Sequence, residues 1–166
     1  LQPCGAGEVG ELWLQGPSVA GGYYGLPEVS KETFGATLPG EPGTFLRTGD
    51  LGFLHDGEVY LTGRFKDLII VGGKNHYPND LEKTAIQATP AIRPGSCAAF
   101  SARHEDQESV VLIAEMRGKV VAQAEAKGVV DALYSGVANA IRGAITKGHG
   151  VPLRSVVLVT ERSLPK

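Results

Sequence analysis

The sequence predicts an α+β protein, with a β-rich first part followed by a small unit in which helices cover a short sheet. Two observations lead to this prediction. Residues 1 to about 64 are rich in glycine and proline and contain short apolar runs typical of strands. After Arg64 the chain alternates between strand-like and helix-like segments. At 166 residues and 42% hydrophobic content, the chain is long enough for one domain or for parts of two, with a buried core.

The first part contains three segments with clear local patterns. GELWLQG (residues 10–16) has the pattern of a strand, and SKETF begins a short helical turn for which Ser30 is a candidate N-cap. LGFLHDGEVYLTG (residues 51–63) contains two apolar runs on either side of Asp56-Gly57, a dipeptide suited to a tight turn. We therefore expect a β-hairpin at this turn.

The segment after Arg64 predicts a strand, a loop and a helix. DLIIV (residues 67–71) has the composition of a buried strand, and Gly72-Gly73 then turn the chain and permit a mobile loop. PNDLEKTAIQAT is expected to be helical, with Pro78 in the first turn.

The rest of the chain continues the alternation. A long helical stretch contains three glycines, which weaken it, so we expect it to be bent or broken. The expected elements are strands at 96–102 and 109–117, a polar turn between them at 103–108, the helical stretch at about 120–147 and a final strand at 154–161.

Composition and charge disfavour several classes of function. The net charge is −2 without a visible basic cluster, so a role on nucleic acid or at a membrane surface has no electrostatic support. The apolar runs are too short to span a bilayer, and residue 1 does not open a signal peptide. Cys4 and Cys97 suggest neither a disulfide framework nor a metal site, and Cys97 has the setting of a small core residue. A reducing cytoplasm without membrane insertion is therefore the expected location.

Two residues around the predicted hairpin are candidates for binding a sugar. Asp50, in RTGDLG, precedes the hairpin, and its ionised carboxylate could accept hydrogen bonds from the vicinal hydroxyls of a ribose. Alternatively, Asp50 only stabilises its own turn. Arg64 could be a fixed donor to hydroxyls or phosphate, or the solvated end of a strand.

The junction between the two textures gives two more candidates. Lys66-Asp67 fits an exposed hinge between compact units, or ordinary surface charge. In the following loop, His76 could titrate near neutral pH, although a histidine beside Tyr77 is more often a packing residue. Neither metal-ligand spacing, nor a Ser/His/Asp constellation, nor a P-loop is present. The residues alone thus predict two pieces, a hinge and sugar contacts.

The ordered combination of motifs carries more than any one of them. GEVGELWLQGPSVAGGYYG, followed by FLRTGDLGFLHDGEVYLTGRFKDLIIVGGKNHYPNDLE, strongly resembles the adenylate-forming (AMP-binding) enzyme superfamily, which includes acyl-CoA ligases, peptide-synthetase adenylation domains, luciferases and fatty acyl-AMP ligases. This resemblance implies that residues 1–65 are the C-terminal end of the large N-terminal adenylation domain. Residues 66–166 then form most of the small, mobile C-terminal domain.

The resemblance also implies a role for individual residues. Asp50 matches the acid that binds the ribose hydroxyls of ATP and of the acyl-adenylate, and Arg64 matches a second contact to ribose or phosphate. Lys66 matches the hinge position of the family. ATP and Mg²⁺ are the implied cofactors, with no metal ligand expected in this chain. The implied transfer loop, which approaches the active site in the second half-reaction, contains Gly73, Lys74, Asn75, His76 and Tyr77.

The chain departs from the family pattern at its end. It stops at Leu164-Pro165-Lys166, whereas the family carries, a few residues after this proline, a Gly-Lys whose lysine acts in adenylation. Lys166 lies too early to be that lysine, so the catalytic lysine is expected beyond the chain end. The phosphate loop of the family, which lies upstream, is also missing. We therefore expect the 166-residue chain alone to be inactive.

The loop sequence also points to one branch of the family. KNHYPNDLE and GRFKDLIIV look most like fatty acyl-AMP ligases, which implies a fatty acid substrate, an acyl carrier protein as acceptor and a role in polyketide or lipid biosynthesis. An acyl-CoA ligase is the alternative enzyme. A non-catalytic relic of the same fold is the alternative from another class, although a scaffold has no need of the intact RTGD and GR.

Overall fold

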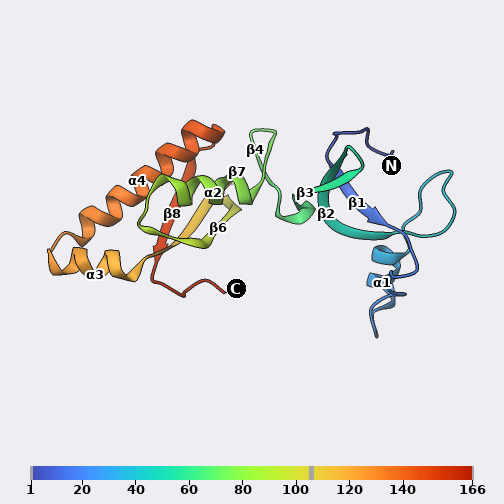
Figure 1. Ribbon diagram of the computed structural model, residues 1–166, viewed down its shortest axis with the longest axis horizontal. Helices are drawn as coiled ribbons and strands as arrows, with labels where there is room; N and C mark the ends of the chain where they lie inside the picture. Colours follow the sequence, from blue (N-terminus) through green and yellow to red (C-terminus); the bar gives the residue numbers. More distant parts are fainter. Residues whose placement is uncertain (1, 105–106, 166) are drawn as a thin grey trace. The chain divides into compact units, whose positions relative to one another are not determined.

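The computed structural model describes residues 2–104 and 107–165. The chain divides into two compact units, the first ending at Lys66 and the second beginning at Asp67. This boundary falls one residue after the position expected from the sequence. Figure 1 shows the helices and strands of each unit.

The first unit is built on a three-stranded antiparallel sheet. Its strands are β1 (Gly10–Leu14), β2 (Leu46–His55) and β3 (Glu58–Arg64), in the order β1-β2-β3. The expected hairpin between β2 and β3 is confirmed. Asp56 and Gly57 form its two-residue turn with φ of 49° and 79°. Asp and Gly tolerate positive φ at both turn positions better than most residues, so this dipeptide suits the turn.

The helix of the first unit begins earlier than the sequence predicted. Helix α1 covers Pro27–Phe34, with the proline in its first turn. Ser30 therefore lies inside the helix, and its predicted role as N-cap is wrong. Its Oγ donates to the carbonyl of Leu26 at 2.7 Å and accepts the N–H of Tyr23 at 2.8 Å, which ties the preceding loop to the helix.

The second unit opens with a small hairpin. After the one-turn 3₁₀ helix η1 (Phe65–Asp67), strand β4 (Ile69–Val71) pairs antiparallel with β5 (Lys74–His76). Gly72 and Gly73 form the turn, with φ of 58° and 74°. The predicted strand and turn are confirmed, but the mobile loop expected after them is largely a second strand.

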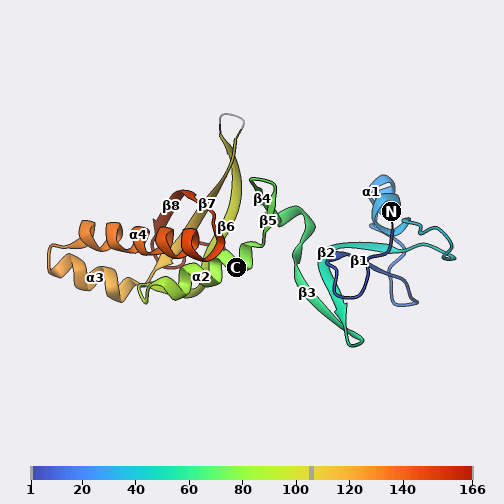
Figure 2. The same ribbon diagram turned by 90° about the horizontal axis from the view of Figure 1, so that it is seen from above.

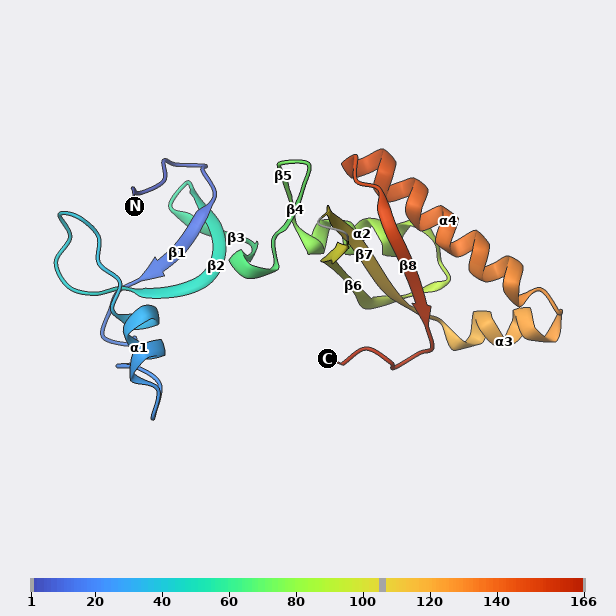
Figure 3. The same ribbon diagram turned by 180° about the vertical axis from the view of Figure 1, so that it is seen from behind.

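A three-stranded sheet with helices against it makes up the rest of the second unit, as Figures 2 and 3 show. Strand β7 (Gln107–Met116) is central, antiparallel to β6 (Ile92–His104) and parallel to β8 (Leu153–Val159). Helix α2 (Pro78–Ala88) contacts β6, and helix α4 (Val130–His149) contacts β8 and α2. The α+β class and the short helix-covered sheet are therefore confirmed. The middle of the predicted turn at 103–108 falls at residues 105–106, outside the described residues.

The long helical stretch is broken, as its glycines predicted. Helix α3 (Gly118–Ala126) ends at a turn in which Gly128 has φ of 67°, and α4 begins at Val130. Positive φ strains residues with a Cβ, so glycine is the natural residue at this turn. The break lets α3 and α4 cover the return from β7 to the parallel strand β8, a connection that requires a crossover.

The core of the second unit lies between the sheet and the helices α2 and α4. Burial of the apolar side chains in this core supplies the main driving force for folding of the unit. The buried side chains come from β4, α2, β6, β7, α4, β8 and two connecting segments: Ile69, Leu81, Ala85, Ala91, Ile92, Ala99, Val110, Leu112, Ala114, Met116, Val137, Ile141, Ile145, Val151 and Leu153. Within the described ranges, no helix is long and apolar enough to cross a membrane.

Candidate functional site

An acidic and a basic side chain face each other at the end of the first hairpin. Asp50 on β2 is the cross-strand partner of Arg64, the last residue of β3. The Nε of Arg64 donates to Oδ1 of Asp50 at 3.1 Å. The two side chains are 39% and 52% exposed, so the pair is open to solvent and to a ligand.

A β-bulge brings the two residues to one face of the sheet. The pairs nearest the turn run His55–Glu58 to Gly52–Leu61, but the next pair joins Leu51 to Gly63, so Thr62 is an extra residue. If the hairpin register continued without the bulge, Leu51 would pair with Thr62 and Asp50 with Gly63, and Arg64 would point to the opposite face.

Asp50 lies within β2 and not in the turn that the sequence predicted, and the backbone at Gly49 just before it is held by neighbouring groups and not by the Asp50 carboxylate. Gly49 has φ of 71°, and the hydroxyl of Thr48 accepts the N–H of Asp50 at 3.0 Å. The same hydroxyl donates to the carbonyl of Leu12 at 2.8 Å. This arrangement favours a carboxylate that serves a ligand over one that stabilises its own turn.

A shallow pocket of about 350 Å³ adjoins the pair. Arg64 and Lys66 line it together with residues that the sequence analysis did not single out, among them Glu11, Tyr23 and Arg47. Glu11 and Arg47 lie on neighbouring strands and form an ion pair at 2.9 Å. The sequence showed Glu11 in the strand-like run 10–16 and Arg47 in FLRTGD, but only the strand pairing shows that the two charges meet.

The indole of Trp13 completes this cluster. Its Nε1 donates to Oε2 of Glu11 at 3.0 Å, and the guanidinium of Arg47 lies 5.6 Å from the ring centre. Partial burial opposes ionisation of Glu11, but the hydrogen bonds from Trp13 and Arg47 hold its pKa below the ordinary value. Glu11 is therefore ionised at neutral pH and pairs with Arg47, as Asp50 pairs with Arg64 across the neighbouring strands.

The hinge candidate Lys66 is exposed in the turn η1 and is the last residue of the first unit. Its position at the boundary fits a pivot, because few contacts restrain a residue between compact units.

The candidate transfer segment is the β4–β5 hairpin. Ile69 is buried and anchors the hairpin in the core, while Lys74 and Asn75 are exposed. His76 and Tyr77 are half-buried at its base, where the carbonyl of Tyr77 accepts the N–H of Asp80 in the first turn of α2. Gly73 is exposed in the turn between the strands.

The surroundings of His76 favour its neutral form. Burial first, and then the charges of His149 and Lys74, lower its pKa below the ordinary value. At neutral pH His76 is therefore uncharged. Of the five predicted loop residues, Lys74 and Asn75 are the side chains that the hairpin presents to solvent.

Metal and thiol chemistry find little support in this chain. Within the ranges that the structure describes, no three His, Cys, Asp or Glu side chains gather as metal ligands, so no residue here is assigned to Mg²⁺. Cys97 is half-buried against the core, and burial raises its pKa to about 12. Its thiol is therefore protonated at neutral pH and is not an activated nucleophile.

Comparisons with known proteins identify relatives over the whole chain. No protein-family model matches it. It is 43% identical over 167 residues to a Mycobacterium leprae protein named as the fatty-acid–CoA ligase FadD21, covering 98% of this chain and 28% of that protein. It is 40% identical over 168 residues to JamA of Moorena producens, named as a medium-chain-fatty-acid–[acyl-carrier-protein] ligase, covering 100% of this chain and 27% of that protein.

A solved structure shows the same fold. The chain aligns with a fatty acyl-adenylate ligase structure, from a study of the enzymes of E. coli and L. pneumophila, with a TM-score of 0.75 and 34% identity. The alignment covers 99% of this chain and 26% of the solved chain. The chain thus spans little more than a quarter of the length of the proteins it matches.

Proposed function

Since the chain belongs to the adenylate-forming superfamily of ligases, we propose that it is part of an AMP-forming enzyme that activates a fatty acid with ATP. In the first half-reaction, the substrate carboxylate attacks the α-phosphorus of ATP to give an acyl-adenylate and pyrophosphate. In the second, a thiol displaces AMP. The residues of this chain contribute to nucleotide binding and to the change between the two steps.

The facing pair Asp50 and Arg64 carries this proposal. One oxygen of the Asp50 carboxylate accepts from Arg64, which leaves its other oxygen to accept from the two neighbouring hydroxyls of a ribose. The remaining N–H groups of Arg64 can donate to the same sugar or to a phosphate. The pair therefore fits the ribose end of ATP and of the acyl-adenylate.

Removal of the acid tests the nucleotide site. In the complete ligase we expect Asp50→Ala to weaken ATP binding about tenfold or more, because charge-assisted hydrogen bonds contribute roughly 1.5–3 kcal/mol each. The ATP affinity of Asp50→Asn should lie between those of the natural enzyme and of Asp50→Ala. Glu58→Ala, which removes an exposed carboxylate from the same hairpin, is the matched control. An ATP affinity that Asp50→Ala leaves unchanged would show that Asp50 has no part in binding.

The two half-reactions require different arrangements of groups. One rigid constellation cannot be preorganised for attack on phosphorus and also for attack by a thiol. We propose that the second unit moves about Lys66 between the two steps and that its hairpin brings Lys74 and Asn75 to the site for the second.

Restriction of the pivot tests this motion. Lys66→Pro fixes φ near −65° and removes a backbone donor, so acyl-adenylate formation should survive while transfer fails. Lys66→Ala keeps the backbone free and should transfer normally. Equal slowing of both steps by the proline would place the pivot elsewhere.

The proposed acceptor is the phosphopantetheine thiol of an acyl carrier protein. The hairpin segment KNHYPNDLE supports this choice, as do the likeness to the fatty acyl-adenylate ligase structure and the name of JamA. The name of FadD21 favours the second candidate, an acyl-CoA ligase.

A comparison of acceptors separates the two candidates. The complete enzyme is given a fatty acid and ATP, with either CoA or a phosphopantetheinylated carrier protein. We expect efficient acylation of the carrier and little acyl-CoA. Efficient release of acyl-CoA would replace the carrier-protein proposal with the acyl-CoA ligase.

We expect the 166-residue chain alone not to catalyse acid-dependent exchange of labelled pyrophosphate into ATP. It spans little more than a quarter of its relatives' length. Exchange above a control without protein would contradict this expectation. If the longer protein also showed no pyrophosphate exchange, a non-catalytic relic would be favoured over an enzyme.

A further inference from the structure

A buried carboxylate of the second unit has no part in the site described above. Glu115 lies near the end of β7 and is 1% exposed. Its Oε2 accepts Nη1 of Arg93 at 2.8 Å, and its Oε1 accepts the backbone N–H of Leu164 at 2.9 Å. A buried charge destabilises a fold unless it is paired, so both bonds contribute to keeping it there.

A second acidic residue extends this network along the segment after β8. Glu161 accepts the backbone N–H of Gly118 through Oε2 at 3.2 Å, and its Oε1 lies 3.7 Å from Nε of Arg93. Arg93 therefore joins both carboxylates. The segment from Thr160 to Pro165 is consequently tied to β6 through Arg93, to β7 through Glu115 and to the first residue of α3, Gly118.

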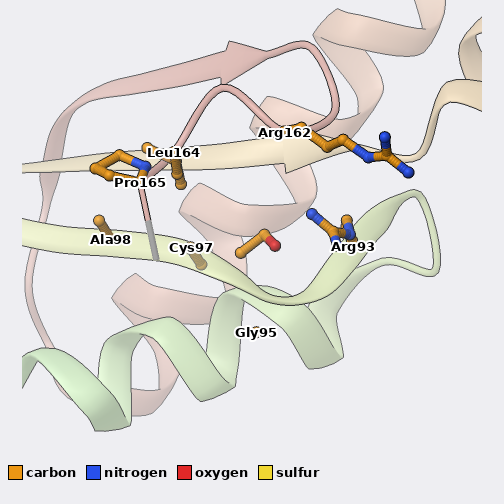
Figure 4. Close-up of a pocket in the computed structure, with 8 residues that line it drawn as sticks. Arg93, Gly95, Cys97, Ala98, Arg162, Leu164 and Pro165 are labelled. Atoms are coloured by element: carbon orange, nitrogen blue, oxygen red, sulfur yellow. The ribbon is translucent and has the colours of Figure 1, made fainter.

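The segment is held by these polar bonds more than by burial. A cavity of about 710 Å³ lies between it and β6. In Figure 4, Arg93 and Arg162 lie at one end of this cavity, and Leu164 and Pro165 lie at the other. Leu164 is half-buried, and its neighbours Ser163 and Pro165 are exposed. Loss of the bond from Leu164 to Glu115 should therefore release the segment without opening the core.

We propose that Glu115 is a positioning residue. Together with Arg93 it forms a polar clasp that fixes the course of residues 160–165 and so sets where, and in which direction, the chain passes Pro165. The clasp belongs to the second unit, whereas Asp50 and Arg64 belong to the first.

One consequence rests on the proposed function. If the complete enzyme carries its adenylation lysine a few residues beyond Pro165, the clasp delivers that lysine to the first half-reaction. Glu115 would then influence adenylation without touching a reacting atom, and would have no part in the transfer step.

The clasp itself is tested in the 166-residue chain by amide hydrogen exchange. Glu115→Gln replaces a charged acceptor by a neutral one and presents an N–H₂ group to Arg93 or to Leu164. We expect exchange at Leu164 to accelerate about tenfold or more. Exchange at Ile141, in the core helix, should not change. Glu108→Gln, the same replacement at an exposed position of the same strand, should leave both rates unchanged.

Proteolysis gives an independent measure of the same release. Trypsin should cleave after Arg162 faster in Glu115→Gln, while cleavage after Arg154, within β8, reports opening of the whole unit and should not change. Arg93→Lys keeps one charge but cannot pair with both carboxylates, so its effect should be intermediate. Equal rates at Leu164 and Arg162 in all variants, or equal acceleration throughout the unit, would overturn the clasp.

The delivery step is tested in the complete enzyme by separate assays of its half-reactions. Glu115→Gln should lower the maximal rate of pyrophosphate exchange about tenfold, while thioester formation from supplied acyl-adenylate keeps its rate. Equal rates in both assays would overturn delivery. A wild-type enzyme without acid-dependent exchange would refute the proposed function, and the exchange at Leu164 would still decide the clasp.

Discussion

Residues 67–166 bury a continuous apolar core, whereas the described residues 2–66 bury a single apolar side chain, Leu51. The sheet of the first unit instead exposes large apolar side chains. These exposed side chains of the sheet include Leu14, Leu54, Val59, Tyr60 and Leu61. In the second unit the corresponding strands are covered by α2 and α4.

The two units therefore differ in how they are stabilised. The second unit carries its own core and can move as one body, which a pivoting domain requires. The first unit resembles one side of a larger core, because its sheet leaves large apolar side chains exposed and buries only one. Its candidate site residues, Asp50 and Arg64, are positioned by strand pairing and not by burial.

The contrast in stability between the two units is tested by producing each unit on its own. Residues 67–166 alone should unfold cooperatively in urea, because their core is complete. Residues 1–66 alone should show no cooperative transition, because one buried apolar side chain cannot offset the conformational entropy of the chain. Circular dichroism and the dispersion of amide resonances measure both. A cooperative transition in residues 1–66 would refute the contrast.

A core truncation should act on one unit alone. Ile141 is fully buried in α4, so Ile141→Ala should lower the free energy of unfolding of the second unit by about 2–5 kcal/mol. Circular dichroism follows the helices of that unit, and fluorescence of Trp13, the chain's one tryptophan, follows the first. Leu61→Ala, at a side chain that is 68% exposed, is the control with an effect within about 0.5 kcal/mol. A cooperative Trp13 transition that coincides with that of the helices and shifts with it would show that the units unfold together.

Two glycines of the second unit should respond with opposite signs. Gly73→Ala places a Cβ at φ of 74° in the hairpin turn and should destabilise the unit by about 1–2 kcal/mol. Gly136→Ala, inside α4, should stabilise it by about 0.5–1 kcal/mol. An added Cβ meets nothing within 4 Å at either position, so backbone conformation alone separates them. Urea midpoints measure the two changes, and an equal sign would contradict this explanation.

The smallest global effect is expected from the clasp, and it should depend on pH. The hydrogen bonds from Leu164 and Arg93 lower the pKa of Glu115 to about 2. A folded-state pKa below the ordinary value of 4.5 means that the stabilisation is complete above that value and disappears as the pH falls toward 2. The difference in Tm between the natural chain and Glu115→Gln should therefore be constant from about pH 5 to 7 and shrink below 4.5. A difference that persists undiminished at pH 2 would assign the effect to something other than the charge.

Local patterns were sufficient where a few neighbouring residues decide the conformation. The β2–β3 hairpin follows from Asp56-Gly57, the helix α2 from Pro78 and its apolar spacing, and the break between α3 and α4 from Gly128. The local pattern wrongly predicted Ser30 as a helix N-cap, because helix α1 begins at Pro27. It also failed at residues 74–76, because three residues are too few to show the alternation of a strand.

The sequence by itself determined the fold class, the order of the elements and the candidacy of Asp50 and Arg64, because hydrophobic period, turn residues and motifs are local properties. Only the tertiary structure decided which side chains meet. The one-residue bulge at Thr62 turns Arg64 to the face of Asp50, and strand pairing brings Arg47 to Glu11. The clasp joins Glu115 to Arg93 and Leu164, which are 22 and 49 positions away in the sequence. Such contacts depend on register and burial, which are set by the packing of whole elements. The local sequence around each residue therefore does not predict them.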